Sequence, residues 1–110
     1  MTDFKILQKV YDMIAYGQIC LRQFPKLEKH VLASDIRKSM YALLELSVRA
    51  NKKYYKKTTL QDMDIEIEVL RTFLRLSLDQ KYINLHKYEF WSKQLNEIGK
   101  MLGGWMKATT

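Results

Sequence analysis

The run Asn51–Thr59 places four lysines around two adjacent tyrosines and is the stretch best suited to binding another molecule. The residues concerned are Lys52, Lys53, Tyr54, Tyr55, Lys56 and Lys57. Lysine ammonium groups attract phosphates, and tyrosine rings offer faces on which unpaired bases can stack. The spacing therefore indicates a contact site for nucleic acid or for a polymerase that carries it. A solvated loop whose charges keep the protein in solution explains the same residues equally well.

Further basic residues flank the apolar helix faces and are candidates for the same interface: Arg37, Lys38, Arg49, Arg71 and Arg75. Arg37 and Lys38 are adjacent on an exposed helix flank, where an ordinary solvated surface is the simpler interpretation. Arg71 and Arg75 lie one helical turn apart. They could bind phosphate, pair with acidic groups across a subunit contact, or flank the core, and the sequence leaves these three roles open.

The residue types that perform catalysis or bind metals do not form a recognised pattern. Cys20, His30 and His86 have no zinc-binding spacing. His86 and Glu89 supply, in reverse order, only one of the two Glu-x-x-His pairs that a carboxylate-bridged metal bundle needs. No glycine-rich phosphate loop is present. We therefore expect a protein that is not an enzyme and that uses no cofactor or metal.

Composition favours a basic protein with a single helical domain over residues 1–110. Nineteen lysines and arginines against twelve acidic residues give a net charge of +7, which favours a polyanionic partner. Residues 27–58 hold eight basic and three acidic residues, whereas residues 59–81 hold three basic and five acidic ones. The single cysteine, Cys20, is expected to be buried in a helix. With no signal sequence and no membrane span in the sequence, we expect a cytoplasmic protein.

Apolar residues recur at helical spacing in four segments, which predicts an all-α protein. The expected helices run from about Asp3 to Phe24, from Leu27 to Lys53, from Leu60 to Lys81, and from Leu85 onward. Asp3, Thr59 and Asn84 are expected to cap the first, third and fourth of them, and Pro25 ends the first. Short connections between four amphipathic helices predict an antiparallel up-down-up-down four-helix bundle.

The first and third helices carry apolar faces of different widths. The expected core stripe of the first helix is Phe4, Leu7, Tyr11, Ile14 and Leu21, widened by Val10 and Ile19. That of the third is Leu60, Met63, Ile67, Leu70, Leu74 and Ser77. The third helix is also apolar outside its stripe, at Val69, Phe73, Leu76 and Leu78. A helix that is apolar on more than one side is usually buried both within the fold and in an assembly. We therefore expect a homo-oligomer.

The other helices are expected to pack around the last one. Its stripe consists of Trp91, Leu95, Ile98, Leu102 and Trp105. Gly99 and Gly103 lie on a neighbouring line, and because a glycine inside a helix costs about 1 kcal/mol relative to alanine, we interpret them as points of close packing. A helix stop at Gly103–Gly104 is the alternative. Gly17 in the first helix is either a further close contact or a local kink.

Three segments in order resemble a known family: FPKLEKHVLASDIRKS (24–39), LRTFLRL (70–76) and EIGKMLGGWMK (97–107). Together they are similar to Avd, the accessory variability determinant of diversity-generating retroelements. Avd shares a four-helix-bundle superfamily with proteins encoded in ribosomal-RNA intervening sequences. Arg37, Lys38, Arg71 and Arg75 match basic positions of the family pattern, whereas the lysine-rich loop at 52–57 matches none.

The resemblance implies a non-catalytic homopentamer that binds a reverse transcriptase and its template RNA, with DNA as a second candidate ligand. Such a protein supports the mutagenic reverse transcription that diversifies a target gene. The alternative is a structural or protein-interaction bundle of the intervening-sequence type, with no specific nucleic-acid role.

Overall fold

Four long helices account for most of the computed structural model, which describes residues 2–109 and, from residue 5 onward, their side chains. The elements are α1 (Thr2–Leu21), the short 3-10 helix η1 (Lys26–Glu28), α2 (Leu32–Lys52), α3 (Lys57–Asp79) and α4 (Leu85–Ala108). No strand occurs within the described range. The all-α class predicted from the sequence is therefore confirmed.

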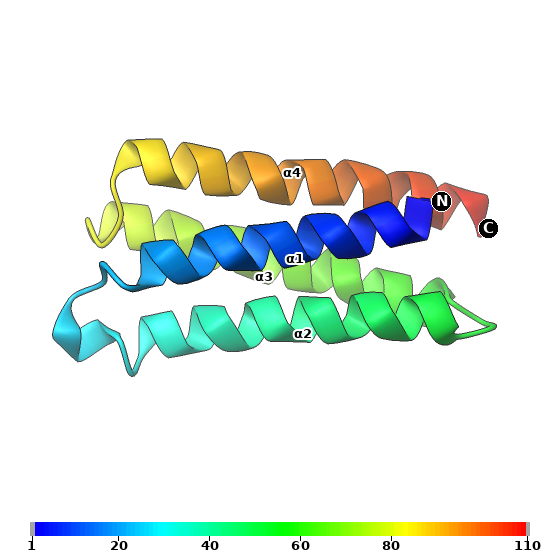
Figure 1. Cartoon of the computed structure of the whole chain (residues 1–110), viewed down its shortest axis with the longest axis horizontal. Helices are drawn as coiled ribbons and strands as arrows, with labels where there is room; N and C mark the ends of the chain where they lie inside the picture. The colour runs from blue at the N-terminus through cyan, green and yellow to red at the C-terminus, as the bar shows by residue number, and fades with distance from the viewer. Residues whose placement is uncertain (1, 110) are drawn as a thin grey trace.

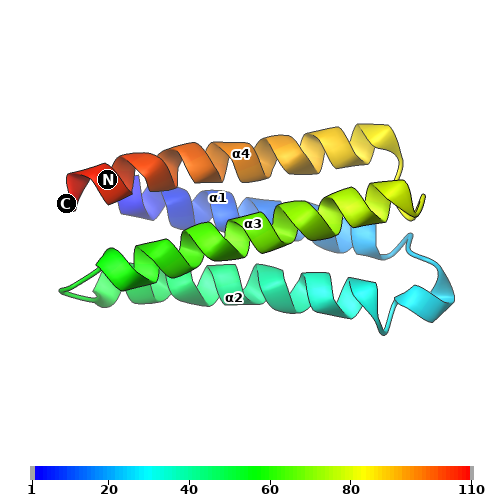
Figure 2. The same cartoon turned by 180° about the vertical axis from the view of Figure 1, so that it is seen from behind.

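The helices form one elongated bundle, 43 × 23 × 19 Å, in which consecutive helices run in opposite directions (Figures 1 and 2). Each helix packs against two neighbours, because α1 and α3 both contact α2 and α4. This is the predicted up-down-up-down arrangement. The α2–α3 connection lies at the same end of the bundle as both chain termini, and the other two connections lie at the opposite end (Figure 1).

The stripes expected for α3 and α4 lie in the core, where they pack with buried residues of α1 and α2. All five stripe residues of α4 and all six of α3 are buried. Trp91 is at the centre: its side chain is completely buried, and its indole N–H donates to Met13 Sδ of α1 at 3.3 Å. The core-facing side of α4 is therefore the one that its sequence pattern predicted.

The stripe predicted for α1 is confirmed in part. Ile14, Leu21 and the adjoining Val10 are buried. Tyr11 is 63% exposed, Ile19 is exposed and Leu7 is only half-buried, while the side chains of Asp3 and Phe4 lie outside the described residues. The buried side is rotated from the predicted one and consists of Ile6, Val10, Met13, Ile14, Gly17, Cys20 and Leu21. Apolar residues surround most of this helix, so periodicity alone did not identify its inner side. Gly17 identifies it, because the Trp91 ring lies directly against its backbone.

The glycines differ in what surrounds them. A Cβ atom at Gly17 would lie 2.6 Å from Met40 Sδ and 2.8 Å from Trp91 Cζ2, so this position is a close contact. At Gly99 the nearest atom is Nη2 of the Arg71 side chain, at 3.0 Å. No described atom lies within 4 Å of a Cβ at Gly103, so the close packing expected at this glycine does not occur within the described chain. The helix stop considered there is wrong, since α4 continues to Ala108.

Two helix starts differ from those expected. The chain leaves α1 at Leu21 and forms η1 after Pro25, so α2 begins at Leu32 and not at Leu27. Leu27 is 87% exposed, because the chain at this point crosses the end of the bundle instead of packing along it. Thr59 is not the cap of α3: the helix begins at Lys57, and Thr59 is buried inside it.

The α3–α4 connection is tightly organised. Tyr82 N–H donates to the Ser77 carbonyl and Lys81 N–H to the Leu78 carbonyl, both at 2.9 Å. This is the Schellman arrangement, with Lys81 in the left-handed conformation (φ 65°) that glycine usually occupies. The predicted cap of α4 is confirmed, since Asn84 Oδ1 accepts from Lys87 N–H at 2.8 Å.

One polar bond links the second and third helices inside the packed region. Ser39 is buried on α2, and its hydroxyl donates to Glu66 Oε2 of α3 at 2.5 Å. Asp62, Asp64 and Glu68 are exposed, as expected for the acidic start of α3. Glu66 is the exception, because it faces α2.

Candidate nucleic-acid interface

Residues 52–57, termed here the tyrosine loop, join α2 to α3 at one end of the bundle. Tyr54 is 88% and Tyr55 84% exposed, and their ring centroids lie 4.8 Å apart with the rings at 80° to each other. Lys52, Lys53 and Lys57 are also exposed. None of these three ammonium groups forms an ion pair with a described side chain. The loop therefore presents two aromatic rings beside uncompensated positive charge.

Lys56 is the lysine of the loop that turns inward. Its ammonium group donates to the carbonyl oxygens of Ala50 at 2.5 Å and Lys53 at 2.7 Å, with a longer bond to Asn51 at 3.4 Å. It also lies 5.9 Å from the centre of the Trp105 ring. The last carbonyls of a helix lack partners within the helix and carry partial negative charge. Lys56 satisfies them. Its ammonium group therefore supports the loop and is not the exposed contact that the sequence predicted.

The predicted arginines are less available than their exposure on helix flanks suggested. Arg49 pairs with Glu45 at 2.9 Å, Arg71 with Glu68 at 2.6 Å and Arg75 with Asp79 at 3.3 Å. Arg71 also donates to Asn96 of α4 at 3.3 Å, across the backbone of Gly99. Of the three roles left open for Arg71 and Arg75, pairing with acidic groups is observed, but within the chain.

The structure does not bring the predicted basic residues onto one surface of the protomer. Arg37 donates to Gln18 of α1 at 3.0 Å, and therefore lies on the α1–α2 side. Lys38, the next residue of α2, is exposed. Arg71 and its partner Asn96 lie on the α3–α4 side. The tyrosine loop lies at the end of the bundle. These are three separate groups.

An exposed apolar stripe follows the outer side of α3. Ile65 is 56%, Val69 36% and Leu76 42% exposed, and their spacing of four and seven residues places them on one line. The sequence had indicated Val69 and Leu76, but Ile65 was missed because it lies among acidic residues. Its i, i+4 relation to Val69 was the available signal. Phe73 and Leu78, the other two residues named, are half-buried.

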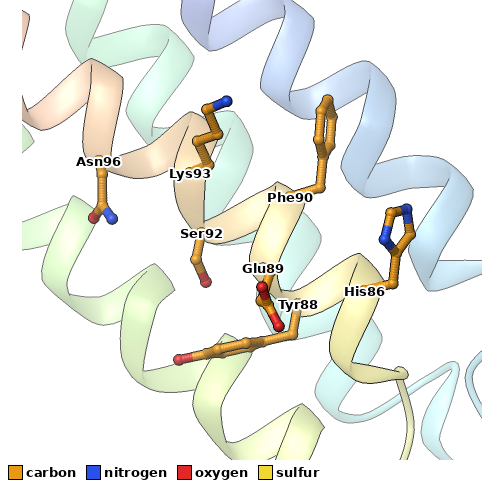
Figure 3. Close-up of a pocket in the computed structure, with 7 residues that line it drawn as sticks. All are labelled: His86, Tyr88, Glu89, Phe90, Ser92, Lys93 and Asn96. Carbon is orange, nitrogen blue, oxygen red and sulfur yellow. The ribbon is translucent and has the colours of Figure 1, made fainter.

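The His86–Glu89 pair does not form a site. Both residues line a shallow hollow on α4 with Tyr88, Phe90, Ser92, Lys93 and Asn96 (Figure 3). Figure 3 shows that these side chains splay to two sides of the helix, His86 away from Glu89. Over the described part of the chain, no group of three or more His, Cys, Asp or Glu residues is placed to hold a metal ion.

Cys20 is a buried, free cysteine, as expected from its place in the first helix. Burial raises the pKa of its thiol, and this outweighs the lowering effects of Tyr16 and Lys87. A thiol that keeps its proton is a poor nucleophile and a poor metal ligand. Cys20 therefore belongs to the core.

The fold and its surface define a small basic four-helix bundle with one tyrosine-bearing end and an exposed apolar stripe on α3. None of the helices in the described range is both long enough and apolar enough to span a membrane. The chain belongs to the bAvd-like family, whose model matches residues 4–109. This is the family that the three sequence segments resembled. A comparison with curated protein sequences gives no match.

Proposed function

We propose that this chain is a non-catalytic accessory protein of a diversity-generating retroelement. It binds the element's reverse transcriptase and template RNA or cDNA through the basic surface of a homo-oligomer, and so supports mutagenic reverse transcription. The observation that carries this proposal is the family match over residues 4–109. The net charge of +7 and the uncompensated lysines of the tyrosine loop support it.

The exposed stripe on α3 supports assembly. Ile65, Val69 and Leu76 leave apolar surface in water on the side of the bundle away from the core, and each large apolar side chain gains about 1.5–3 kcal/mol when it is fully buried. Contact with another copy removes this surface from water. A pentamer, the assembly implied by the family resemblance, would also multiply the positive charge fivefold, which strengthens long-range attraction of a phosphate chain.

Native mass measurement tests the assembly. We expect the wild-type protein to form an oligomer, and the double variant Ile65→Asp/Leu76→Asp to shift toward the monomer. The matched control is Ile19→Asp/Val48→Asp, which places the same charges at similarly exposed sites on α1 and α2. A wild-type monomer at micromolar concentration, or equal loss of mass in both variants, contradicts the proposed interface.

Salt-dependent RNA binding tests the nucleic-acid role. For a single strand, the slope of log affinity against log salt becomes shallower by about 0.7 for each phosphate that the protein no longer neutralises. We expect Lys52→Gln/Lys53→Gln to weaken RNA binding and flatten this slope. Lys26→Gln/Lys29→Gln, which removes two charges from the opposite end of the bundle, is the control. Lys56 is left unchanged because it supports the loop.

The alternative is a structural or protein-interaction bundle whose charge serves solubility. The ion pairs of Arg49, Arg71 and Arg75 favour it, because paired guanidinium groups contribute less to attraction of a polyanion. Capture of a reverse transcriptase that does not change with salt or with the lysine variants, together with no RNA binding, would support this alternative.

A further inference from the structure

The tyrosine loop exposes more aromatic surface than the fold needs. Tyr54 and Tyr55 are the most exposed of the large aromatic residues in the described chain, and neither ring contacts the core. The rings touch edge to face at 4.8 Å and 80°. An edge-to-face pair covers one ring face and leaves the remaining faces open, so flat groups can still stack on both rings.

Lys56 fixes the tyrosine loop to the end of α2. Its bonds to the Ala50 and Lys53 carbonyls tie the turn to the end of α2. They also place a positive charge where the helix end would otherwise repel a phosphate. The turn that carries the two rings is therefore already ordered. Binding of a ligand to the rings then costs less conformational entropy of the loop than it would if the loop were free.

The charges beside the rings specify the kind of ligand. Lys52, Lys53 and Lys57 lie within three residues of the tyrosines in the chain, are exposed and have no ion-pair partner among the described residues. Stacking faces next to free ammonium groups match a strand whose bases are unpaired and whose backbone is anionic. A duplex offers the phosphates but not the base faces, because its bases are already stacked on each other.

We propose that the tyrosine loop binds unpaired nucleotides, and that Tyr54 and Tyr55 make the protein favour single strands over duplexes. This inference rests on the proposed nucleic-acid binding. It adds that the ligand is single-stranded and names the residues that distinguish it from a duplex. The lysines contact phosphates of either form, while the rings contact only exposed bases. Selectivity thus depends on the rings and overall affinity on the lysines.

Fluorescence anisotropy with two labelled probes, an oligouridine RNA and a blunt-ended RNA duplex of two complementary strands, separates these contributions. Stacking on an aromatic ring contributes about 1–3 kcal/mol per base, so Tyr54→Ala/Tyr55→Ala should weaken oligouridine binding roughly tenfold or more. Binding of the duplex should change by less than about twofold, since the lysines remain. An oligothymidine DNA probe shows whether the loop also accepts DNA, and loss of its binding in the same variant supports the same mechanism.

Two controls keep the result interpretable. Tyr54→Phe/Tyr55→Phe retains both rings and should bind oligouridine like the wild type. Tyr11→Ala removes another exposed tyrosine, from the middle of α1, and should change nothing. Because both loop tyrosines lie almost entirely in water, the alanine variant should fold normally, which circular dichroism checks.

The proposal is overturned if the alanine variant weakens both probes equally or neither of them while the wild type binds RNA. It is also overturned if RNA binding is intact and capture of the reverse transcriptase is abolished, since the rings would then be a protein contact. A wild type that binds no probe removes both this inference and the nucleic-acid role on which it rests.

Discussion

The same substitution, glycine to alanine, is expected to have opposite effects at Gly17 and Gly103. Alanine is favoured over glycine inside a helix by about 1 kcal/mol, and both glycines lie inside helices. At Gly103 the new methyl group meets no described atom within 4 Å. The propensity gain should remain, so Gly103→Ala should raise the free energy of unfolding by about 0.5–1 kcal/mol.

At Gly17 the new methyl group would overlap the core. Its distances of 2.6 Å to Met40 Sδ and 2.8 Å to Trp91 Cζ2 are well inside the roughly 3.5–4.0 Å of favourable contact. Both neighbours are completely buried, and the Trp91 ring cannot bend away as the Met40 chain can. Overpacking of this kind costs about 1–3 kcal/mol. After the propensity gain is subtracted, Gly17→Ala should destabilise the protein by up to about 2 kcal/mol.

Urea unfolding followed by far-ultraviolet circular dichroism measures both variants against the wild type. Protein concentration must be matched, because assembly makes the midpoint depend on concentration. The two variants should differ by the overpacking cost of about 1–3 kcal/mol, or roughly 5–15 degrees in Tm. Equal stability of Gly17→Ala and Gly103→Ala would refute the tight packing around Trp91. Destabilisation by Gly103→Ala would show that another copy or partner packs on α4 at that point.

Three further predictions concern the helix ends and the buried thiol. Lys56→Met should lower stability by about 1–2 kcal/mol in urea unfolding, because it leaves the α2 carbonyls without a charged donor, while Lys57→Met, at an exposed lysine, should change little. Lys81→Gly should raise the free energy of unfolding by about 0.5–1 kcal/mol in the same assay, since glycine adopts a positive φ without steric cost. Burial raises the pKa of Cys20, so the folded state keeps this proton longer than the unfolded state does. The free energy of unfolding should therefore fall as pH rises past about 8.5. Cys20→Ala should flatten this fall, and unchanged pH dependence in that variant would contradict the assignment.

Sequence periodicity predicted the fold because α2, α3 and α4 each carry an apolar stripe at helical spacing that lies in the core. In α3 and α4, residues such as Leu70 and Trp91 could be placed in the core from spacing alone. In α1 apolar residues occur on most sides, so the inner side depends on the contact between Gly17 and Trp91. That contact joins residues far apart in the sequence, and no local pattern contains it.

The amino-acid composition of the tyrosine loop predicted a candidate binding site, but the contacts of its lysines and of the arginines could not be predicted. Exposure of Tyr54 and Tyr55 follows from their place in a polar turn, and the sequence indicated it. The inward turn of Lys56 depends on where α2 ends and on the position of Trp105 from another helix. The pairing of Arg71 likewise requires Asn96 and the open backbone at Gly99. Such contacts are decided by the tertiary structure.

The bond between Ser39 and Glu66 has a consequence for the alignment of the helices. Leucines, isoleucines and methionines could exchange neighbours if α2 slid along α3 by one turn, about 5.4 Å. Such a slip would separate the hydroxyl from the carboxylate and leave a partly buried charge without its donor, which costs more than the bond itself contributes. Ser39→Ala should therefore allow neighbouring alignments to become populated, and the protein would lose a unique packing before it loses its helices.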